Sequence, residues 1–167
     1  MHTSNPSRWP DFSFLTAHPA HFLALGFGAG LSRVGPGTVG TLVALPLFYL
    51  LMQAPELVHY TTILVLFVLG IPICGVAGQH LGVSDHGSIV WDEIVAMLLV
   101  LEFTPLGWHW WLAAFLLFRL FDIWKPFPIR QFDARLKGGF GVMFDDLLAA
   151  AYAIIALEGL QWLITHY

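Results

Sequence analysis

The sequence predicts an all-α, polytopic membrane helix bundle. Hydrophobic residues make up 57% of the 167 residues and charged residues only 11%, whereas soluble domains carry about 25% charged residues. The mean hydropathy is +0.74, and residues 34–118 contain neither Lys nor Arg. A chain of this length predicts one domain, which we assign to residues 1–167, with residues 1–19 as a polar N-terminal tail.

A membrane-spanning helix needs roughly 20 apolar residues, within a range of about 17 to 25. We expect about five apolar segments, at Thr41–Ala54 (extendable to Leu57), Leu57–Ala77, Ile94–Leu101, Pro105–Phe121 and Val142–Ile164. The segment His21–Leu31 is too short to cross easily, so we predict a short re-entrant or interfacial helix there. The first nineteen residues lack the pattern of a secretory signal, so we expect them to stay on the chain.

Basic residues are concentrated in Phe118–Asp146, FRLFDIWKPFPIRQFDARLKGGFGVMFDD, which holds five of the seven Lys and Arg residues. Cytoplasmic loops are enriched in Lys and Arg, so we place this segment in the cytoplasm. Counting spans from there brings four polar features to the same membrane face: Gly26–Thr41, Asp92–Glu93, Asp122–Lys137 and Asp145–Asp146. The small formal charge of −4 argues against nucleic acid as a partner.

Two acidic pairs, Asp92–Glu93 and Asp145–Asp146, are predicted where a loop meets an apolar helix. Carboxylates close to hydrocarbon are costly and usually mark function. Together with Asp122 they offer up to five oxygen donors, the ligand type that Mg²⁺ takes. Either pair alone is equally consistent with solvated acids stabilised by a helix dipole; the convergence of both pairs with Asp122 favours a metal site.

Basic and Gly-rich positions predict an anion site beside these acids. Pro126 disfavours helix at Lys125, so we expect Lys125 to project from a fixed turn. In LSRVGPGTVGT, backbone amides and the positive end of a helix starting near Thr41 suit phosphate. Taken alone, each feature is better explained as an ordinary helix stop or turn. The phosphate-binding candidates are Arg33, Gly37, Thr38, Lys125, Arg130 and Lys137.

Other polar residues are predicted to lie outside the site. We expect Glu102 to be solvated near the outer end of a span, and His80 and His86 to belong to a polar loop. An aromatic belt at the outer membrane surface is predicted from Trp108, Trp110 and Trp111.

Four segments, GLSRVGPGTVGT, VWDEIVAM, FRLFDIWKPFPI and LKGGFGVMFDDLLAA, together resemble the phosphatidylglycerophosphatase A family. The resemblance runs from about Gly26 to Ala153. It departs from the family pattern in the first loop, where Arg33 stands for a Pro and Gly35 for an Ala. These departures affect the loop and leave the acids in place.

The resemblance implies a Mg²⁺-dependent phosphatase that converts phosphatidylglycerophosphate to phosphatidylglycerol, acting on a phospholipid in the bilayer. It further implies a multi-pass protein of the bacterial inner membrane whose active site faces the cytoplasm. The metal ligands expected on this basis are Asp92, Glu93, Asp122, Asp145 and Asp146, and the catalytic set is the same five acids with Lys125. Water attack and a phospho-aspartyl intermediate both remain open, and the sequence gives no oligomeric state.

Two other functions compete with this interpretation. A small transporter or channel with a cation site would place its acids at mid-bilayer depth, whereas here they lie at segment ends beside Pro and Gly. A phospholipid synthase using a CDP-activated lipid would show Asp-Gly-x-x-Ala-Arg, which the sequence lacks.

Overall fold

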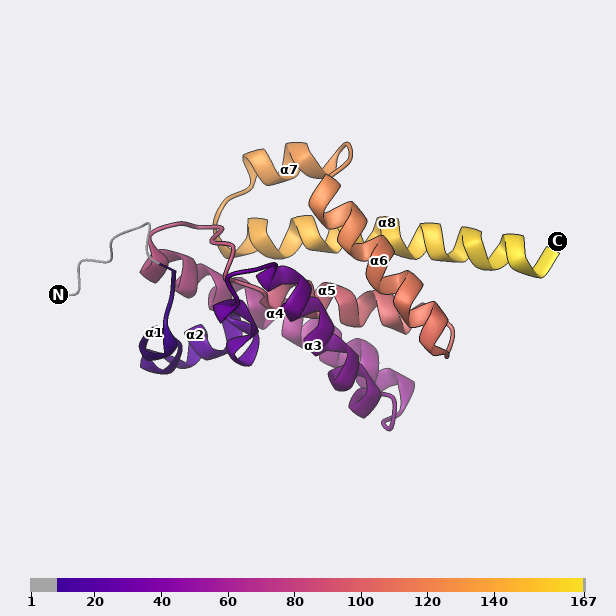
Figure 1. The fold of residues 1–167 in the computed structure, drawn as a ribbon, viewed down its shortest axis with the longest axis horizontal. Coiled ribbons are helices and arrows are strands. Elements are labelled where there is room, and N and C mark those ends of the chain that lie inside the picture. The colour runs from indigo at the N-terminus through magenta and orange to yellow at the C-terminus, as the bar shows by residue number, and fades with distance from the viewer. Residues whose placement is uncertain (1–8, 167) are drawn as a thin grey trace.

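The computed structural model describes residues 9–166, and every regular element in that part of the chain is a helix (Figure 1). The N-terminal third forms α1 (Phe12–Ala17), α2 (Pro19–Ala24), the 3₁₀ helix η1 (Gly26–Leu31) and α3 (Pro36–Leu51). The remainder forms α4 (Glu56–Leu81), α5 (Trp91–Glu102), α6 (Trp108–Trp124), α7 (Ile129–Arg135) and α8 (Gly138–His166).

Helix α8 is the long axis of the bundle and extends beyond the other helices at its C-terminal end (Figure 1). Helices α4, α5, α6 and α7 pack against it, and α3 packs on the far side of α5. The short helix α5 is therefore central, and most of its side chains are buried. Close approach of α4 and α8 depends on Gly139, where a Cβ would overlap the carbonyl oxygen of Ile71.

Within residues 9–166, two helices are long and apolar enough to cross a membrane: α4, with 26 residues and mean hydropathy 2.2, and α8, with 29 residues and mean hydropathy 1.8. They cover the predicted segments Leu57–Ala77 and Val142–Ile164. The helices α3, α5 and α6 contain 16, 12 and 17 residues, at or below the lower limit for a perpendicular span. The all-helical prediction is thus confirmed, but five spanning segments are not.

Helix boundaries differ from the predicted ones at two functionally important places. Helix α3 begins at Pro36 instead of near Thr41, because Gly35 is in the left-handed region (φ 54°) and Pro is favoured in the first helical turn. Helix α8 begins at Gly138, so Asp145 and Asp146 lie about two turns inside it. The prediction that this pair lies where a loop meets a helix is therefore wrong.

The segment predicted as re-entrant or interfacial forms α2 and η1, and η1 itself contains a kink, with φ of 60° at Phe27 and 108° at Gly28. Helix α1 lies within the predicted polar tail, of which residues 1–8 are outside the described part. The His21 ring bonds to the Phe14 carbonyl (2.8 Å) and to His80 (2.7 Å). His80 belongs to the last turn of α4, so its assignment to a polar loop was wrong.

Candidate active site

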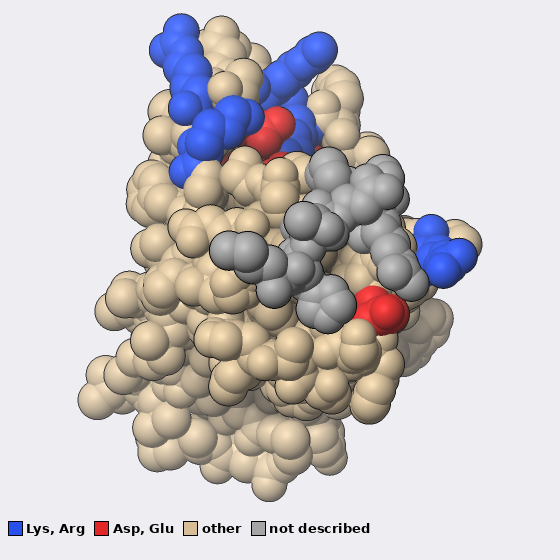
Figure 2. All heavy atoms as spheres, turned by 90° about the vertical axis from the view of Figure 1, so that its left-hand side faces the viewer, with Lys and Arg blue, Asp and Glu red and all other residues tan. Residues whose placement is uncertain are grey.

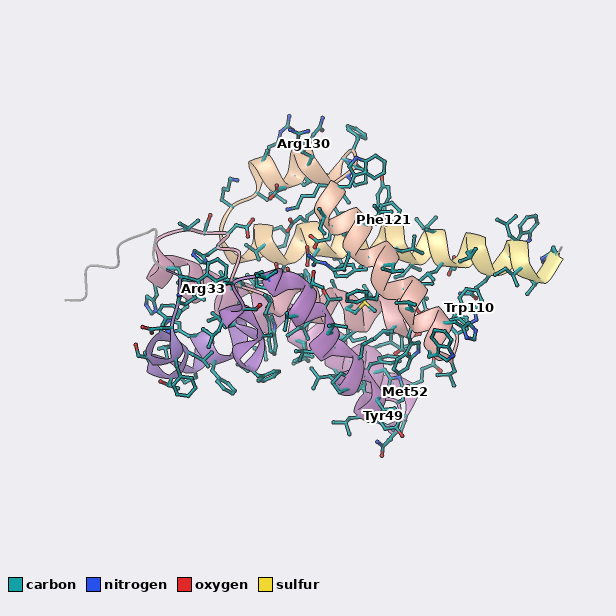
Figure 3. All side chains as sticks on the ribbon, in the orientation of Figure 1. Arg33, Tyr49, Met52, Trp110, Phe121 and Arg130 are labelled. Atoms are coloured by element: carbon teal, nitrogen blue, oxygen red, sulfur yellow. The ribbon has the colours of Figure 1, made fainter. Side chains whose placement is uncertain are left out.

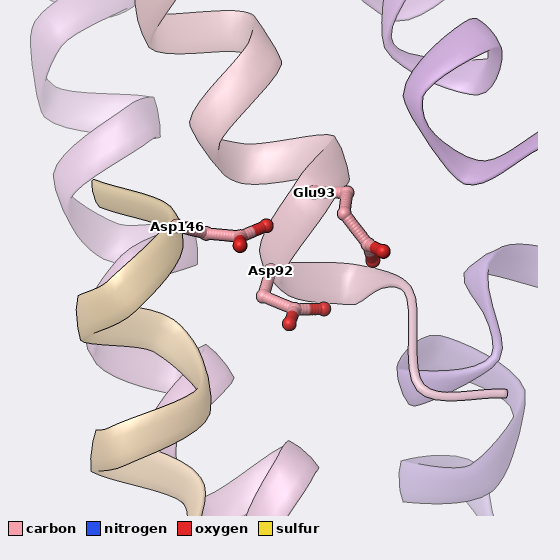
Figure 4. Close-up of side chains that lie close together, drawn as sticks. All are labelled: Asp92, Glu93 and Asp146. Carbon is pink, nitrogen blue, oxygen red and sulfur yellow. The ribbon is translucent and has the colours of Figure 1, made fainter. Parts of the chain in front are cut away.

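Three acidic side chains from two helices meet in the interior of the bundle. Asp92 and Glu93 lie in the first turn of α5, and Asp146 lies on α8. Each offers a carboxylate oxygen, and these oxygens all lie within 4.8 Å of one another. Figure 4 shows Asp146 directed from α8 toward the start of α5. We call these three residues the acid cluster.

The acid cluster is buried and short of hydrogen-bond donors. Asp92 is 8% exposed and Asp146 3% exposed, and the Glu93 side chain is 13% exposed. One oxygen of each residue, namely Asp92 Oδ1, Glu93 Oε2 and Asp146 Oδ2, has no hydrogen-bond partner among the described residues. Buried polar atoms are normally satisfied, so three unpartnered oxygens in one place mark a candidate ligand site.

The donor set fits a hard divalent cation. Carboxylate oxygens are the ligands that Mg²⁺ takes, and Mg²⁺ commonly uses a few carboxylates and keeps several waters. The close approach of these carboxylates in a medium of low dielectric is repulsive, and a cation between them would offset that repulsion. The acid cluster therefore has the chemistry of the metal site that the sequence predicted, built from three of the five expected acids.

The fourth predicted acid, Asp122, lies next to Asp146 of the acid cluster and is also linked to Glu93 through Arg119. Arg119 Nη1 lies 2.6 Å from Asp122 Oδ2, one helical turn along α6, and 3.6 Å from Glu93 Oε1. The same nitrogen donates to Thr41 Oγ1 on α3 at 3.5 Å. The sequence prediction missed Arg119 as a site residue. The sequence feature that could have identified it is an arginine inside an apolar segment, followed by an acid three positions later.

The fifth predicted acid, Asp145, accepts a hydrogen bond from Lys125. Lys125 Nζ also lies 3.3 Å from Asp133 Oδ1 on α7. Burial disfavours the Lys125 charge, but the hydrogen bond and the charge of Asp145, with help from Asp133, raise its pKa above the usual range. Lys125 is therefore a fixed ammonium group beside the acid cluster. As predicted from Pro126, it follows the end of α6 in a turn conformation, with φ 46°.

The Gly-rich loop reaches the acid cluster at Gly37, in the first turn of α3. A Cβ on Gly37 would overlap Glu93 Oε1 and lie 3.1 Å from both terminal nitrogens of Arg119. The Gly37 carbonyl accepts a hydrogen bond from Thr41 Oγ1 at 2.8 Å. Thr38 is half-buried one residue further along. The predicted meeting of this loop with the acids is thus present, and it requires a residue without a side chain at position 37.

The remaining predicted phosphate-binding residues, Arg33, Arg130 and Lys137, are exposed. Figure 2 shows Lys and Arg side chains gathered around acidic atoms at one edge of the molecule, with a further basic group set apart. Arg130 projects from α7, and Arg33 lies near the N-terminal helices (Figure 3). Arg130 and Lys125 line the same surface hollow of about 660 Å³. Lys137 Nζ instead donates to the Asp133 carbonyl at 3.1 Å.

The sequence matches the family model described as Phosphatidylglycerophosphatase A over residues 22–161. The chain belongs to the phosphatidylglycerophosphatase A family. All the residues of the acid cluster, together with Gly37, Arg119 and Lys125, lie inside the matched range.

Relatives of the family cover nearly the whole chain. It is 48% identical over 147 residues to the phosphatidylglycerophosphatase A of Haemophilus influenzae, covering 87% of this chain and 90% of that protein. It is 40% identical over 152 residues to the Escherichia coli protein of the same name, with 90% and 86% covered. A Bacteroides thetaiotaomicron protein described as a candidate phosphatidylinositol-3-phosphatase is 37% identical over 150 residues, with 85% and 93% covered. No solved structure matches the chain.

Membership of the phosphatidylglycerophosphatase A family makes the chain a phosphatase. It does not favour the alternative of a transporter or channel. Bacterial relatives and the two long apolar helices also indicate a membrane protein.

Proposed function

We propose that this protein is a Mg²⁺-dependent phosphatase that hydrolyses the terminal phosphate monoester of phosphatidylglycerophosphate to give phosphatidylglycerol. The observation that carries this proposal is the acid cluster, with one unpartnered oxygen on each of Asp92, Glu93 and Asp146. Fixed positive groups stand next to it, and the relatives that bear the phosphatidylglycerophosphatase A name cover most of the chain.

Asp92, Glu93 and Asp146 are the residues that would hold Mg²⁺. When bound there, the ion would neutralise phosphate charge and lower the pKa of a coordinated water. Asp122 and Asp145 are already engaged with Arg119 and Lys125. We therefore assign these two acids the role of positioning the two cationic side chains, in place of direct metal ligation.

Lys125 is the group best placed to stabilise charge on the phosphoryl group during transfer. Its ammonium is held by Asp145 and Asp133 and borders the hollow that Arg130 also lines. Fixed cations aimed at developing charge are an effective form of transition-state stabilisation. Arg119 has a second role: it links Glu93, Asp122 and Thr41, and so fixes the start of α5 relative to α3 and α6.

In the proposed reaction a water molecule attacks phosphorus and the bond from phosphorus to the glycerol oxygen breaks. A carboxylate oxygen of the acid cluster that is not engaged with the cation accepts the proton of the water as general base. The departing glycerol oxygen takes up that proton from the protonated carboxyl group and becomes the hydroxyl of phosphatidylglycerol.

We place the site at the cytoplasmic face of the bacterial inner membrane, in a multi-pass protein that forms a single domain. Support comes from the apolar helices α4 and α8 and from the concentration of Lys and Arg between residues 119 and 137. Positive residues favour the cytoplasmic side. This location would let a lipid substrate present its headgroup from the inner leaflet.

The test is phosphate release from phosphatidylglycerophosphate in detergent micelles by the purified protein, with Mg²⁺, with EDTA, and with Mg²⁺ restored. Phosphatidylinositol 3-phosphate serves as the competing substrate, because one relative carries a related name. We expect Mg²⁺-dependent release with a preference for phosphatidylglycerophosphate. Absence of release from this lipid would refute the assigned reaction, and full activity in EDTA would refute the metal site.

A further inference from the structure

A largely apolar groove of about 290 Å³ lies between α4, α5 and α8. Each helix contributes side chains spaced by one turn. They include Tyr60, Leu64 and Phe67 on α4, Ala96 and Leu99 on α5, and Leu147 on α8. Residues three and four positions apart lie on the same face of a helix. The groove that these side chains line therefore runs parallel to the helices.

The groove ends at the acid cluster. Asp92 lines the groove and also belongs to the cluster, and its Oδ1 atom has no hydrogen-bond partner. From Asp92 the α5 wall continues through Ala96 to Leu99, a distance of about 10 Å at the rise of an α-helix. The groove therefore has a carboxylate at one end and hydrocarbon along most of its length.

The direction of the groove follows from how α4 and α5 are paired. Trp91 Nε1, at the start of α5, donates to the Leu66 carbonyl in α4. Glu102, at the end of α5, bonds to His59 near the start of α4. The two helices are thus antiparallel. The groove runs from the acid cluster toward the end of the bundle that carries Tyr60.

The groove opens on a face of α4 that other helices leave bare. Leu64 is 62% exposed and Tyr60 42% exposed, although both belong to one of the two helices apolar enough to cross a membrane. An exposed apolar face on such a helix is suited to lipid. A molecule in the bilayer could therefore enter the groove from the side.

We infer that this groove binds one acyl chain of the lipid phosphate whose headgroup is held at the acid cluster. The inference rests on the proposed function and adds the part of the substrate that does not react. The groove is apolar along most of its length and ends at Asp92, which belongs to the acid cluster. A lipid phosphate would place its hydrocarbon chain along the apolar part and its anionic end at the proposed cation. Binding of an acyl chain in the groove would also make acyl-chain length a determinant of substrate specificity, separate from recognition of the headgroup.

The test compares phosphatidylglycerophosphate carrying two oleoyl chains with the same lipid carrying two hexanoyl chains, in one mixed-micelle system. We expect the wild type to favour the long-chain lipid in kcat/KM by at least about tenfold, because each buried methylene contributes roughly a fourfold factor. Ala96→Leu fills the groove between Asp92 and Leu99 and should reduce that ratio to about one. Activity on the short-chain lipid should fall by a smaller factor than activity on the long-chain lipid, because fewer buried methylenes are displaced.

A second variant provides a test that does not depend on whether Ala96→Leu folds correctly. Leu64→Trp narrows the exposed mouth of the groove and should also lower the ratio. Leu69→Trp, on the same helix, is a matched control because Leu69 is 50% exposed and does not line the groove. It should leave the ratio unchanged.

The outcomes separate the inference from the proposed function. Absence of phosphate release from both lipids would remove the proposed function itself. Hydrolysis without chain-length preference, or a preference that survives both Ala96→Leu and Leu64→Trp, would overturn the acyl-chain groove and leave the reaction in place. Loss of a dimer in those two variants, with the ratio intact, would assign the groove to a second copy of the chain and also overturn the inference.

Discussion

Two buried polar sites lie at opposite ends of α5, and they are built in opposite ways. At one end His59 Nδ1 lies 3.1 and 3.2 Å from the two carboxylate oxygens of Glu102, while His59 Nε2 lies 3.0 Å from the Ala54 carbonyl. At the other end the acid cluster leaves one oxygen of each member without a partner. One site has its hydrogen bonds made within the protein, and the other leaves three buried oxygens free to bind a ligand.

The difference helps to distinguish stabilising from functional polar groups. A buried group with its hydrogen bonds made contributes modestly to stability, whereas an unsatisfied one is costly. Proteins tolerate such costs mainly at functional sites. Glu102, which the sequence predicted to be solvated, belongs to the first kind, since its side chain is only 7% exposed and is paired. The acid cluster belongs to the second kind.

The largest expected effect follows from removing one charge of the acid cluster. Asp92→Asn should reduce Mg²⁺-dependent phosphate release by about a hundredfold or more, the scale seen when a key electrostatic group is lost. Glu158→Gln, an exposed carboxylate on the same protein, is the control and should retain wild-type activity. Equal activity in Asp92→Asn and Glu158→Gln would contradict a functional role for the cluster.

Replacing Lys125 tests the positive group beside the acids. Lys125→Met should lower kcat by about ten- to a hundredfold, because charge on the transferring phosphoryl group loses a fixed ammonium. Lys125→Arg should recover part of the activity, since it restores charge with a different geometry. The measurement is steady-state phosphate release. A Lys125→Met enzyme with unchanged kcat would show that Lys125 serves only to neutralise Asp145.

A smaller effect is expected at Gly37. Gly37→Ala introduces a methyl group that overlaps Glu93 Oε1, so the Glu93 carboxylate must move, and activity should fall by about tenfold. Gly159→Ala is the matched control, because a Cβ there meets nothing within 4 Å. If the two variants have the same kcat/KM, close contact between the α3 loop and Glu93 is unimportant for catalysis.

The His59–Glu102 pair should show the smallest effect on activity. Breaking this pair should nevertheless lower the stability of the protein. Glu102→Ala leaves His59 without its partner and should cost about 1–2 kcal/mol of stability, with phosphate release unchanged. Asp92→Asn should not lower the Tm measured without metal, because it removes a repulsive charge from the acid cluster. The opposite pattern, a stable Glu102→Ala and an unstable Asp92→Asn, would contradict the distinction between the two sites.

Much of the site was predictable because its chemistry is local in the sequence. Acids beside apolar segments are energetically costly and therefore usually functional. The residue before a proline disfavours the helical conformation, and a glycine-rich loop at a helix start suits an anion. Their convergence followed from a count of apolar segments. The structure places Gly37, Asp92, Glu93 and Asp146 in one neighbourhood.

The sequence could not divide the five acids between metal ligation and ion pairing. That division depends on side-chain direction. Asp145 and Asp146 are adjacent on α8, yet one bonds to Lys125 and the other joins the acid cluster, because successive helical residues point about 100° apart. The Arg119–Glu93 contact and the His59–Glu102 pair were missed for a related reason, since each joins residues of two different helices.

The most direct test is a calorimetric titration of the purified, EDTA-treated protein with Mg²⁺ in detergent. The wild type and Glu158→Gln should show the same saturable binding, and the double variant Asp92→Asn with Asp146→Asn should show none. Mg²⁺ binding that is unchanged in the double variant would contradict the claim that Asp92, Glu93 and Asp146 form the metal site.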